Sequence, residues 1–239
     1  MISQQSDRPK LPSLQIVQQL VANVEIQSIN PYNPVQVEAI PHPWQLLGTG
    51  NYAAVFYHPS YSETVVKIYA PGRSGWAEEV EVYRRLGHHQ AFSECYLTEP
   101  NWLILKRLHG ITLYDCMHLG LKIPPQVIED IDLALEYARS KGLNPHDVHG
   151  RNLMMSGEKG LVVDISDFLN PLPCRAWEDL KQAYYLLYLS LFSWHQLSVP
   201  YWMLDLVRNG YRLYRQILSW LPINNDFKRL AEAKEKNDI

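Results

Sequence analysis

One short stretch of the chain carries residue types that suit phosphoryl transfer. Residues 146–152 read HDVHGRN, so the carboxylate of Asp147 stands five residues before the carboxamide of Asn152. A second carboxylate, Asp164, follows twelve residues after Asn152, at the end of an apolar run. Such oxygens are hard ligands for magnesium, and a carboxylate can orient a hydroxyl that accepts a phosphoryl group. The spacing therefore predicts Asn152 and Asp164 as metal ligands and Asp147 as the base.

A glycine-rich segment upstream has the composition of a phosphate-covering loop. Residues 48–55 read GTGNYAAV and lie between two strand-like runs. Because glycine lets a backbone approach phosphate oxygens without a Cβ clash, Gly48, Gly50, Ala53 and Val55 are candidates for nucleotide contact. The setting, strand to strand, disfavours a dinucleotide fold. A glycine hairpin without a ligand is the alternative, because so short a motif also occurs without a binding function.

A lysine and a glutamate could complete this phosphate site. Lys67 stands among β-branched residues of a predicted strand, where its ammonium needs a carboxylate or phosphate partner. The alternative is that Lys67 lies on the solvent face of the strand. Three acids of the helical run 76–86 compete to face it, and these are Glu78, Glu79 and Glu81. Glu79 is favoured because Tyr83 and Leu86 follow it on the same side of the helix.

The predicted elements that position these residues fall into two groups. The first group has strands within residues 44–69, a helix at 76–86 and further strands within 96–113. The second has a helix from Pro124-Pro125 to about 140, a hairpin at 153–163, and helices at about 176–194 and 199–220. This order predicts an α+β fold of two lobes. The N-lobe has a small antiparallel sheet and one helix, the C-lobe is mostly helical, and the ligand lies between them.

The domain boundaries follow from changes in composition. Residues 1–43 are predicted to be an N-terminal extension that contains a helix from Leu14 to Val24. The main domain covers residues 44–225, with the N-lobe at about 44–106 and the C-lobe at about 107–225. Residues 226–239 form a charged tail that is expected to fray.

Composition excludes several classes of function. The chain has 239 residues and a net charge of −3, without a basic block, which argues against nucleic-acid binding. Its three cysteines are widely spaced, which argues against a disulfide framework and a zinc site. The N-terminus does not resemble a signal peptide, and the longest apolar stretch, 183–194, is too short to span a bilayer. We therefore expect a cytoplasmic protein without a membrane span, whose oligomeric state is open.

Taken together, these motifs resemble those of the protein-kinase-like superfamily. The matching positions, in chain order, are the loop 48–55, Lys67, Glu79, Asp147, Asn152 and Asp164. The resemblance covers about residues 44–221 and implies that Lys67, held by Glu79, contacts the phosphates of ATP. It further implies that the segment from Leu105 to Leu108 is the hinge beside the adenine. Asp179 resembles the helix aspartate that holds the catalytic loop, although a first-turn helix acid is almost as good an interpretation.

The chain also departs from the kinase pattern. Pro145 stands where kinases carry a histidine that braces the catalytic loop, and His146 is displaced by one position. His149 replaces the lysine of serine/threonine kinases and resembles the residue of aminoglycoside-type phosphotransferases, so it is a further catalytic candidate. Asp164-Ile165-Ser166 replaces Asp-Phe-Gly, and about a dozen residues separate Asp164 from the next predicted helix. The chain therefore has essentially no activation loop.

The resemblance implies a compact phosphotransferase of bacterial type that uses ATP and Mg²⁺. A serine/threonine protein kinase with a protein acceptor is the favoured interpretation. A small-molecule kinase of the aminoglycoside/choline-kinase type, acting on a small polar metabolite, is the first alternative. The second is a pseudokinase that binds nucleotide as a non-catalytic module.

Overall fold

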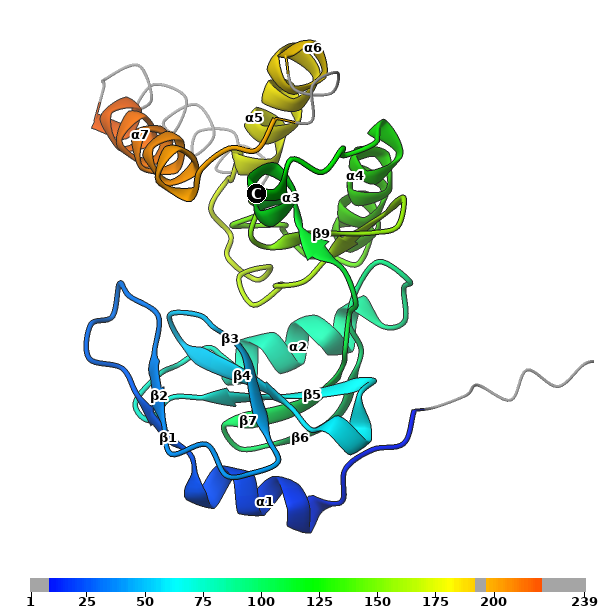
Figure 1. Cartoon of the computed structure of the whole chain (residues 1–239), viewed down its shortest axis with the longest axis vertical. Helices are drawn as coiled ribbons and strands as arrows, with labels where there is room; N and C mark the ends of the chain where they lie inside the picture. The colour runs from blue at the N-terminus through cyan, green and yellow to red at the C-terminus, as the bar shows by residue number, and fades with distance from the viewer. Residues whose placement is uncertain (1–8, 192–196, 221–239) are drawn as a thin grey trace, which may run out of the picture.

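A five-stranded antiparallel sheet forms the centre of the N-lobe in this computed structural model, which describes residues 9–191 and 197–220. Its spatial order is β3 (Gln45–Thr49), β4 (Ala53–Tyr57), β5 (Thr64–Tyr69), β7 (Trp102–Lys106) and β6 (Cys95–Glu99). Figure 1 shows this lobe below the C-lobe, with α2 (Trp76–Leu86) on the sheet face that points toward the C-lobe. The strands and the helix lie where the sequence pattern predicts them.

Strand β5 is buried on both faces because a helix covers each side of the sheet. Val66 and Ile68 belong to the core beneath the sheet, whereas Val65 and Tyr69 belong to the core on the α2 side. Successive side chains of a strand point to opposite faces, so Lys67 shares the α2 face with Val65 and Tyr69. The alternation therefore directs the lysine into the lobe and away from solvent.

The helix α1 (Leu14–Asn23) covers the lower face of the sheet (Figure 1). Ser13 caps its N-terminus by accepting a hydrogen bond from the Ile16 N–H at 3.4 Å. Val17 and Leu20 are completely buried and share a core with residues of β4, β5 and β7. The boundary at residue 43 stays a prediction, but the residues before it supply part of the core of the N-lobe.

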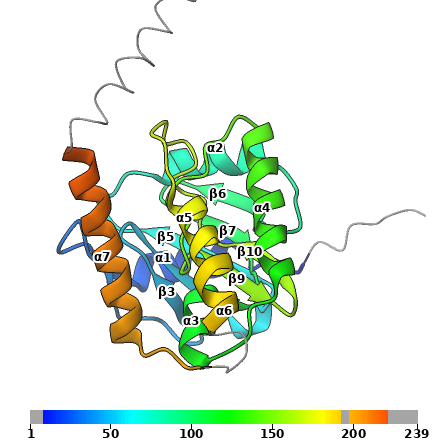
Figure 2. The same ribbon diagram turned by 90° about the horizontal axis from the view of Figure 1, so that it is seen from above.

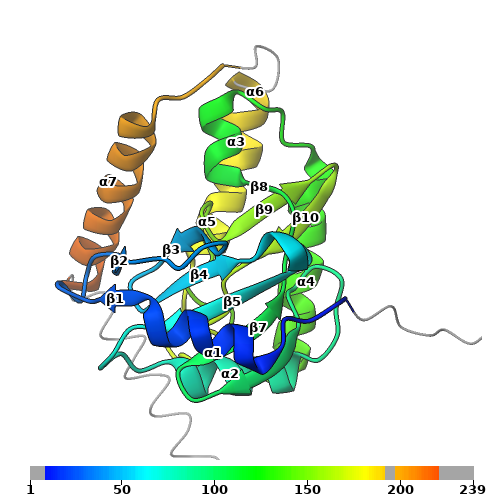
Figure 3. The same ribbon diagram turned by 60° about the horizontal axis from the view of Figure 1, so that its bottom comes forward.

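A short hairpin that the sequence analysis did not predict follows α1. Its strands, β1 (Glu25–Gln27) and β2 (Gln36–Glu38), have three residues each, too few for a readable alternation of apolar and polar positions. In Figure 3 the hairpin lies beside β3 at the edge of the sheet. The Val35 N–H donates to the Gly50 carbonyl at 2.9 Å, so the hairpin is bonded to the glycine-rich loop.

The C-lobe is mostly helical, as predicted, and the fold is the expected two-lobed α+β arrangement. Its helices are α3 (Leu113–Leu119), α4 (Pro125–Ser140), α5 (Ala176–Ala183), the π-helical turn Tyr184–Tyr188, α6 (Leu189–Leu191) and α7 (Tyr201–Trp220). Figure 2 shows α7 standing apart from α5 and α6. A small sheet combines β8 (Ile111–Thr112), β9 (Leu153–Ser156) and β10 (Lys159–Val162). Helix α3 was missed by the sequence analysis.

The predicted hairpin of β9 and β10 packs against α4. A Cβ at Gly160 would lie 2.2 Å from the Val127 carbonyl oxygen, so only glycine allows this close approach. The hairpin also joins the lobes, because the Val162 N–H donates to the Ala91 carbonyl at 2.8 Å. One continuous core extends from Leu86 and Phe92 of the N-lobe side into the C-lobe. The hairpin that precedes Asp164 is therefore rigidly placed.

Some predictions concern residues that the structure does not describe. The charged tail 226–239 and the end of the helix predicted at 176–194 lie outside the described residues. No helix within residues 9–191 and 197–220 has the length and apolar character needed to cross a membrane.

Replacing Leu20 by alanine should lower the free energy of unfolding by about 2–5 kcal/mol, because it leaves a cavity between α1 and the sheet. The side chain is completely buried, whereas Leu14 of the same helix is 44% exposed. Leu14→Ala is the control, and it should change stability by about 0.5 kcal/mol or less. Urea unfolding of both variants checks the difference. Equal losses would show that α1 does not share the core of the lobe.

Candidate active site

A buried ion pair connects β5 with α2. The Lys67 Nζ lies 2.9 Å from Oε1 and 2.8 Å from Oε2 of Glu79. The Lys67 side chain is 12% exposed and that of Glu79 only 1%, so both charges depend on each other. Of the three acids that competed for Lys67, the structure places Glu79 at the lysine, while Glu78 is exposed and Glu81 bonds to Arg84 and Arg85.

A second carboxylate approaches the lysine from the C-lobe. Asp164 Oδ1 lies 3.6 Å from the Lys67 Nζ, and the same oxygen accepts the Ser166 N–H at 3.1 Å. The Asp164 side chain is 41% exposed, so a ligand can reach it. The lysine therefore joins a helix of the N-lobe to the segment that follows β10.

The environment shifts the pKa values of all three groups. Burial alone would lower the pKa of Lys67, but the carboxylates of Asp164 and Glu79 outweigh it and raise the pKa. Burial raises the pKa of Glu79, which Lys67 lowers only in part. For Asp164, burial acts upward, yet the ammonium of Lys67 and the bonds from Ser166 hold the pKa below its usual range. Lys67 is consequently charged throughout the physiological pH range.

The candidate base lies on a tightly turned loop between α4 and β9. Asp147 has a φ of +56°, a left-handed conformation that aspartate tolerates better than most residues. The Asn152 Nδ2 donates to the Asp147 carbonyl at 3.0 Å, which ties the predicted base to the predicted metal ligand. The His149 Nε2 lies 3.6 Å from Asp147 Oδ2. The Asp147 side chain is 53% exposed, so a ligand can reach its carboxylate.

Other residues hold this loop in place of the missing histidine. The Asn144 side chain donates to the Asn170 carbonyl at 2.6 Å and to the Leu172 carbonyl at 2.9 Å. The Tyr114 N–H donates to the Gly150 carbonyl at 3.0 Å. Neither anchor was found from the sequence, because backbone partners leave no residue signature. The bonds fasten the loop to α3 and to the segment after Asp164.

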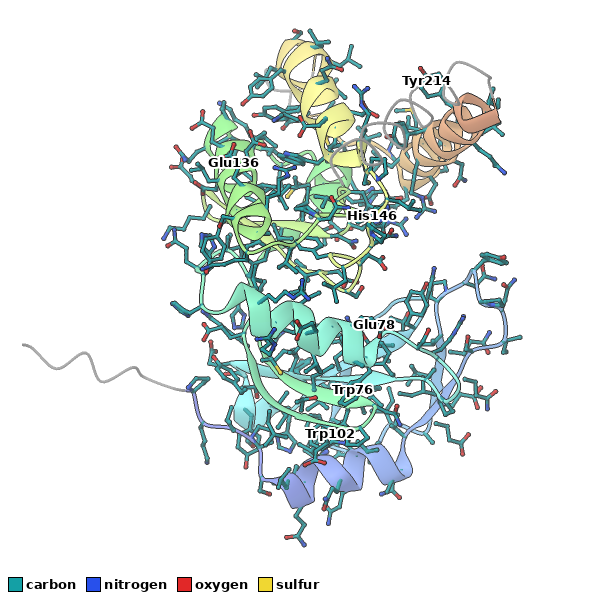
Figure 4. The ribbon with its side chains drawn as sticks, turned by 180° about the vertical axis from the view of Figure 1, so that it is seen from behind. Trp76, Glu78, Trp102, Glu136, His146 and Tyr214 are labelled. Carbon is teal, nitrogen blue, oxygen red and sulfur yellow. The ribbon has the colours of Figure 1, made fainter. Side chains whose placement is uncertain are left out.

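The displaced histidine does not brace the loop through its Nδ1. This nitrogen of His146 is buried and has no hydrogen-bond partner among the described residues. Figure 4 shows His146 at the edge of the C-lobe, across the space between the lobes from Glu78 of α2. The side chain is close enough to Asp167 to counteract part of the rise in the pKa of that acid.

The predicted nucleotide contacts lie on the sheet and its first turn. Gly48 is in β3 and Gly50 in the turn that follows, and a Cβ at Gly48 would meet nothing within 4 Å. Ala53 and Val55 lie in β4, and Leu105 lies near the end of β7, at the start of the predicted hinge. Ala53 and Leu105 belong to the same core cluster as Leu153, and Val55 packs against that cluster.

Two cavities lie near the candidate site, one beside the glycine-rich loop and one beside the catalytic loop. One, of about 270 Å³, lies between the lobes and is lined by Tyr52, Tyr69, Gly75, Glu78, Ser166 and Asp167, among others. The other, of about 350 Å³, includes Arg151 of the catalytic loop and is otherwise lined by Thr112, Tyr114, Asp115, Tyr201 and Asp205. The first cavity is framed by the glycine-rich loop, the start of α2 and the segment after Asp164.

Asp167 lies beside the site residues, whereas the Asp179 carboxylate is bonded elsewhere. Burial and the nearby carboxylates of Asp147 and Asp164 raise the pKa of Asp167. The carboxylate of Asp179 accepts a hydrogen bond from the Tyr211 hydroxyl at 2.7 Å and lies in the first turn of α5, which favours the interpretation of a first-turn helix acid over that of an anchor of the catalytic loop. Asp179 therefore connects α5 with α7. A sequence cannot distinguish these roles, since both use an acid at the start of a helix.

The donor set fits a metal that arrives with a ligand. In the described part of the chain, no three His, Cys, Asp or Glu residues cluster to hold a metal alone. Asn152 and Asp164 offer two oxygen ligands, and magnesium commonly takes one or two protein oxygens together with substrate phosphates. The roles of these residues in metal and nucleotide binding stay predictions.

Comparison with known proteins identifies the family. The fold and the site define a two-lobed protein in which a sheet lysine and a helix glutamate face a catalytic-type loop. A protein of Bacillus subtilis (strain 168) named "Putative serine/threonine-protein kinase YrzF" is 33% identical over 147 residues, which are 60% of this chain and 68% of that protein. The chain therefore belongs to the protein-kinase-like superfamily.

Two further comparisons do not define the family more closely. No family model matches the chain. The crystal structure of a point mutant of the Mycobacterium tuberculosis PknI kinase domain aligns with a TM-score of 0.38 and 19% identity over 51% of this chain. The aligned part covers 57% of that structure, so the chain spans little more than half of it.

Replacing Glu79 by alanine should lower the free energy of unfolding by about 3–5 kcal/mol, because it leaves the buried Lys67 ammonium short of a partner. The neighbouring Glu78 is exposed, so Glu78→Ala is the control and should cost less than about 1 kcal/mol. Chemical denaturation of both variants without any ligand checks the prediction. Equal stabilities would mean that Lys67 does not depend on Glu79.

Proposed function

We propose that the chain is an ATP- and Mg²⁺-dependent phosphotransferase and that its acceptor is a serine or threonine of a protein. The observation that carries this proposal is the meeting of Lys67 with Glu79 of the N-lobe and Asp164 of the C-lobe. The two lobes thereby hold the Lys67 ammonium beside the carboxylate oxygens of Glu79 and Asp164. The serine/threonine specificity is supported by the name of the Bacillus subtilis relative.

Each residue has a defined task in this proposal. Lys67 would bind phosphate oxygens, and Glu79 would hold it in place. Gly48 and Gly50 would cover the phosphates, since no atom of the described chain fills the space beside Gly48. Ala53, Val55 and Leu105 would line the adenine side of the site. These residues bind and orient, which is the main source of catalysis in phosphoryl transfer.

The catalytic loop would act on the acceptor. Asn152 and Asp164 would hold Mg²⁺, which together with ATP would supply the phosphoryl group and neutralise its charge. The exposed Asp147 carboxylate would accept a hydrogen bond from the acceptor hydroxyl and orient its oxygen. His149 would steady the Asp147 carboxylate from 3.6 Å. A cation held by Asn152 and Asp164 would also offset the repulsion between the carboxylates of Asp147 and Asp164 and that of Asp167, whose pKa they raise.

A small polar metabolite as acceptor is the second candidate. The cavity of about 350 Å³ beside Arg151 favours it, because it offers a hollow lined by charged and aromatic side chains directly next to the catalytic loop. Its lining combines the carboxylates of Asp115 and Asp205 with the rings of Tyr114 and Tyr201. A hollow of this size and polarity suits a small hydroxylated compound.

Transfer of labelled phosphate from ATP tests the proposal. Wild-type protein with Mg²⁺ should label a protein acceptor from a cell extract or a generic protein substrate. Asp147→Asn and Asp164→Asn should each lower the rate by about 10²–10³-fold, since each removes a charge at the reacting groups. Asp167→Asn is the control, because Asp167 is the acid that neighbours Asp164 in the sequence. This variant should retain most of the wild-type rate of phosphate transfer.

The outcomes discriminate the candidates. Label that appears in small molecules but not in proteins would favour the metabolite kinase. Tight binding of MgATP without transfer to any acceptor would favour a pseudokinase. If Asp167→Asn lowered the transfer rate more than Asp164→Asn, Asp167 and not Asp164 would be the metal ligand. Unchanged transfer in Asp147→Asn would refute the catalytic assignment.

A further inference from the structure

The buried Glu79 has a third partner besides the two contacts with Lys67. The Tyr69 hydroxyl donates a hydrogen bond to Oε2 of Glu79 and lies 3.3 Å from the Gly75 carbonyl oxygen. The Tyr69 side chain is 3% exposed, and it comes from the end of β5. One hydroxyl thus contacts both the first turn of α2 and the glutamate that this helix supplies to the site.

The contacts of Tyr69 lie at the point where α2 enters the lobe. Gly75 precedes α2 with a φ of +108°, and a Cβ there would lie 3.4 Å from the Tyr69 ring. The positive φ favours glycine at this position, and the Tyr69 ring lies within van der Waals distance of it. Only residues 70–75 connect β5 with α2. The ring of Tyr69 and this short connection therefore set the position of the first turn of α2 together.

Helix α2 is also held at its two ends by other elements. The Trp76 Nε1 donates to the Trp102 carbonyl of β7 at 3.4 Å. The Tyr137 hydroxyl of α4 donates to the Leu86 carbonyl at 2.8 Å. The helix consequently has bonds to the sheet at its start, to Lys67 and Tyr69 in its first turns, and to the C-lobe at its end. All of these partners belong to the chain itself.

The segment after Asp164 is short, and its middle is bonded to Asn144 of the C-lobe. Residues 163–175 connect β10 to α5, and Phe168 within them is completely buried. The Asn144 N–H donates to the Phe168 carbonyl at 2.8 Å, and the Asn144 side chain donates a hydrogen bond to the Asn170 carbonyl. Asn144 thus ties the middle of this segment to the start of the catalytic loop. The position of α2 is set mainly by contacts within the N-lobe.

We propose that Tyr69 is a positioning residue that keeps α2 where Glu79 meets Lys67, so that the nucleotide site is assembled without phosphorylation of the chain. The proposal rests on the proposed phosphotransferase function and adds how that site is regulated. Its physical basis is that a buried carboxylate needs several donors, and Tyr69 supplies one that Lys67 alone cannot replace. Loss of this donor allows α2 to shift and Lys67 to turn toward Asp164.

Lys67 and Tyr69 on β5 and Asp164 after β10 determine how the charge of Glu79 responds to pH. Tyr83 on α2 itself and Cys95 on β6 also face Glu79, and burial together with the Glu79 carboxylate raises their own pKa values. Burial raises the pKa of Glu79, whereas the hydrogen bonds from Lys67 and Tyr69 lower it. Removal of the Tyr69 hydroxyl therefore raises the pKa further. Because the site needs ionised Glu79, the acidic limb of the pH profile of kcat/KM then moves to higher pH.

Tyr69→Phe tests the proposal because it keeps the ring and removes only the hydroxyl. We expect the KM for ATP to rise by about tenfold, which is the loss of one hydrogen bond to a charged group. The kcat should change less, and the acidic limb of kcat/KM should move to higher pH. Tyr83→Phe is the matched control, because Tyr83 is a buried tyrosine of α2 whose hydroxyl interacts with Ser93. Tyr83→Phe should leave both the KM for ATP and the acidic limb of kcat/KM unchanged.

A second measurement remains informative even if the wild-type protein transfers no phosphate. The Glu79 N–H donates to the Gly75 carbonyl at 3.0 Å in the first turn of α2, so its hydrogen exchange reports the anchoring of that turn. Exchange should be faster in Tyr69→Phe than in the wild type and unchanged in Tyr83→Phe. Equal exchange in all three proteins would overturn the proposal, whatever the activity. A wild-type enzyme that loses activity on phosphatase treatment would also overturn it.

Discussion

The charge on Lys67 is the constraint on which the rest of the structure depends. An ammonium that is 12% exposed needs partners of opposite charge, and it finds them in Glu79 of α2 and Asp164 of the C-lobe. The first contact ties α2 to the sheet, and the second links the N-lobe to the segment that follows β10. The glycine-rich loop and the catalytic loop then lie on either side of one fixed cation. A nucleotide phosphate would join this arrangement as an additional partner of the lysine.

The sheet can place the lysine in this way because both of its faces are covered. Helix α1 buries the lower face, which lets β5 carry apolar residues on both sides and still direct Lys67 upward. The β1–β2 hairpin is bonded to the Gly50 carbonyl, so the N-terminal segment also supports the loop above the site. On the C-lobe side, the close packing of Gly160 against α4 fixes the hairpin that leads to Asp164. Residues far from the site thereby determine its geometry.

Periodicity and spacing predicted most of the fold, because long elements repeat their pattern. The strands of residues 44–69 and the helix at 76–86 are examples, and the choice of Glu79 over its neighbours followed from the face of that helix. The β1–β2 hairpin and α3 were missed because such short elements show little periodicity. Tyr69 was recognised only as a strand residue, since its role depends on a contact with Glu79 in space. The sequence left two roles open for Asp179, because its hydrogen-bond partner, Tyr211, comes from α7, which follows much later in the chain.

The binding of MgATP tests the central claim most directly, because it requires no knowledge of the acceptor. Isothermal titration calorimetry of the wild-type protein with ATP should show one site per chain when Mg²⁺ is present and weaker binding when it is absent. Lys67→Met keeps an unbranched side chain and removes the cation, and it should weaken binding by about tenfold or more. Asp164→Asn should remove most of the dependence on Mg²⁺. Absence of nucleotide binding to the wild-type protein, or equal binding to Lys67→Met, would contradict the account.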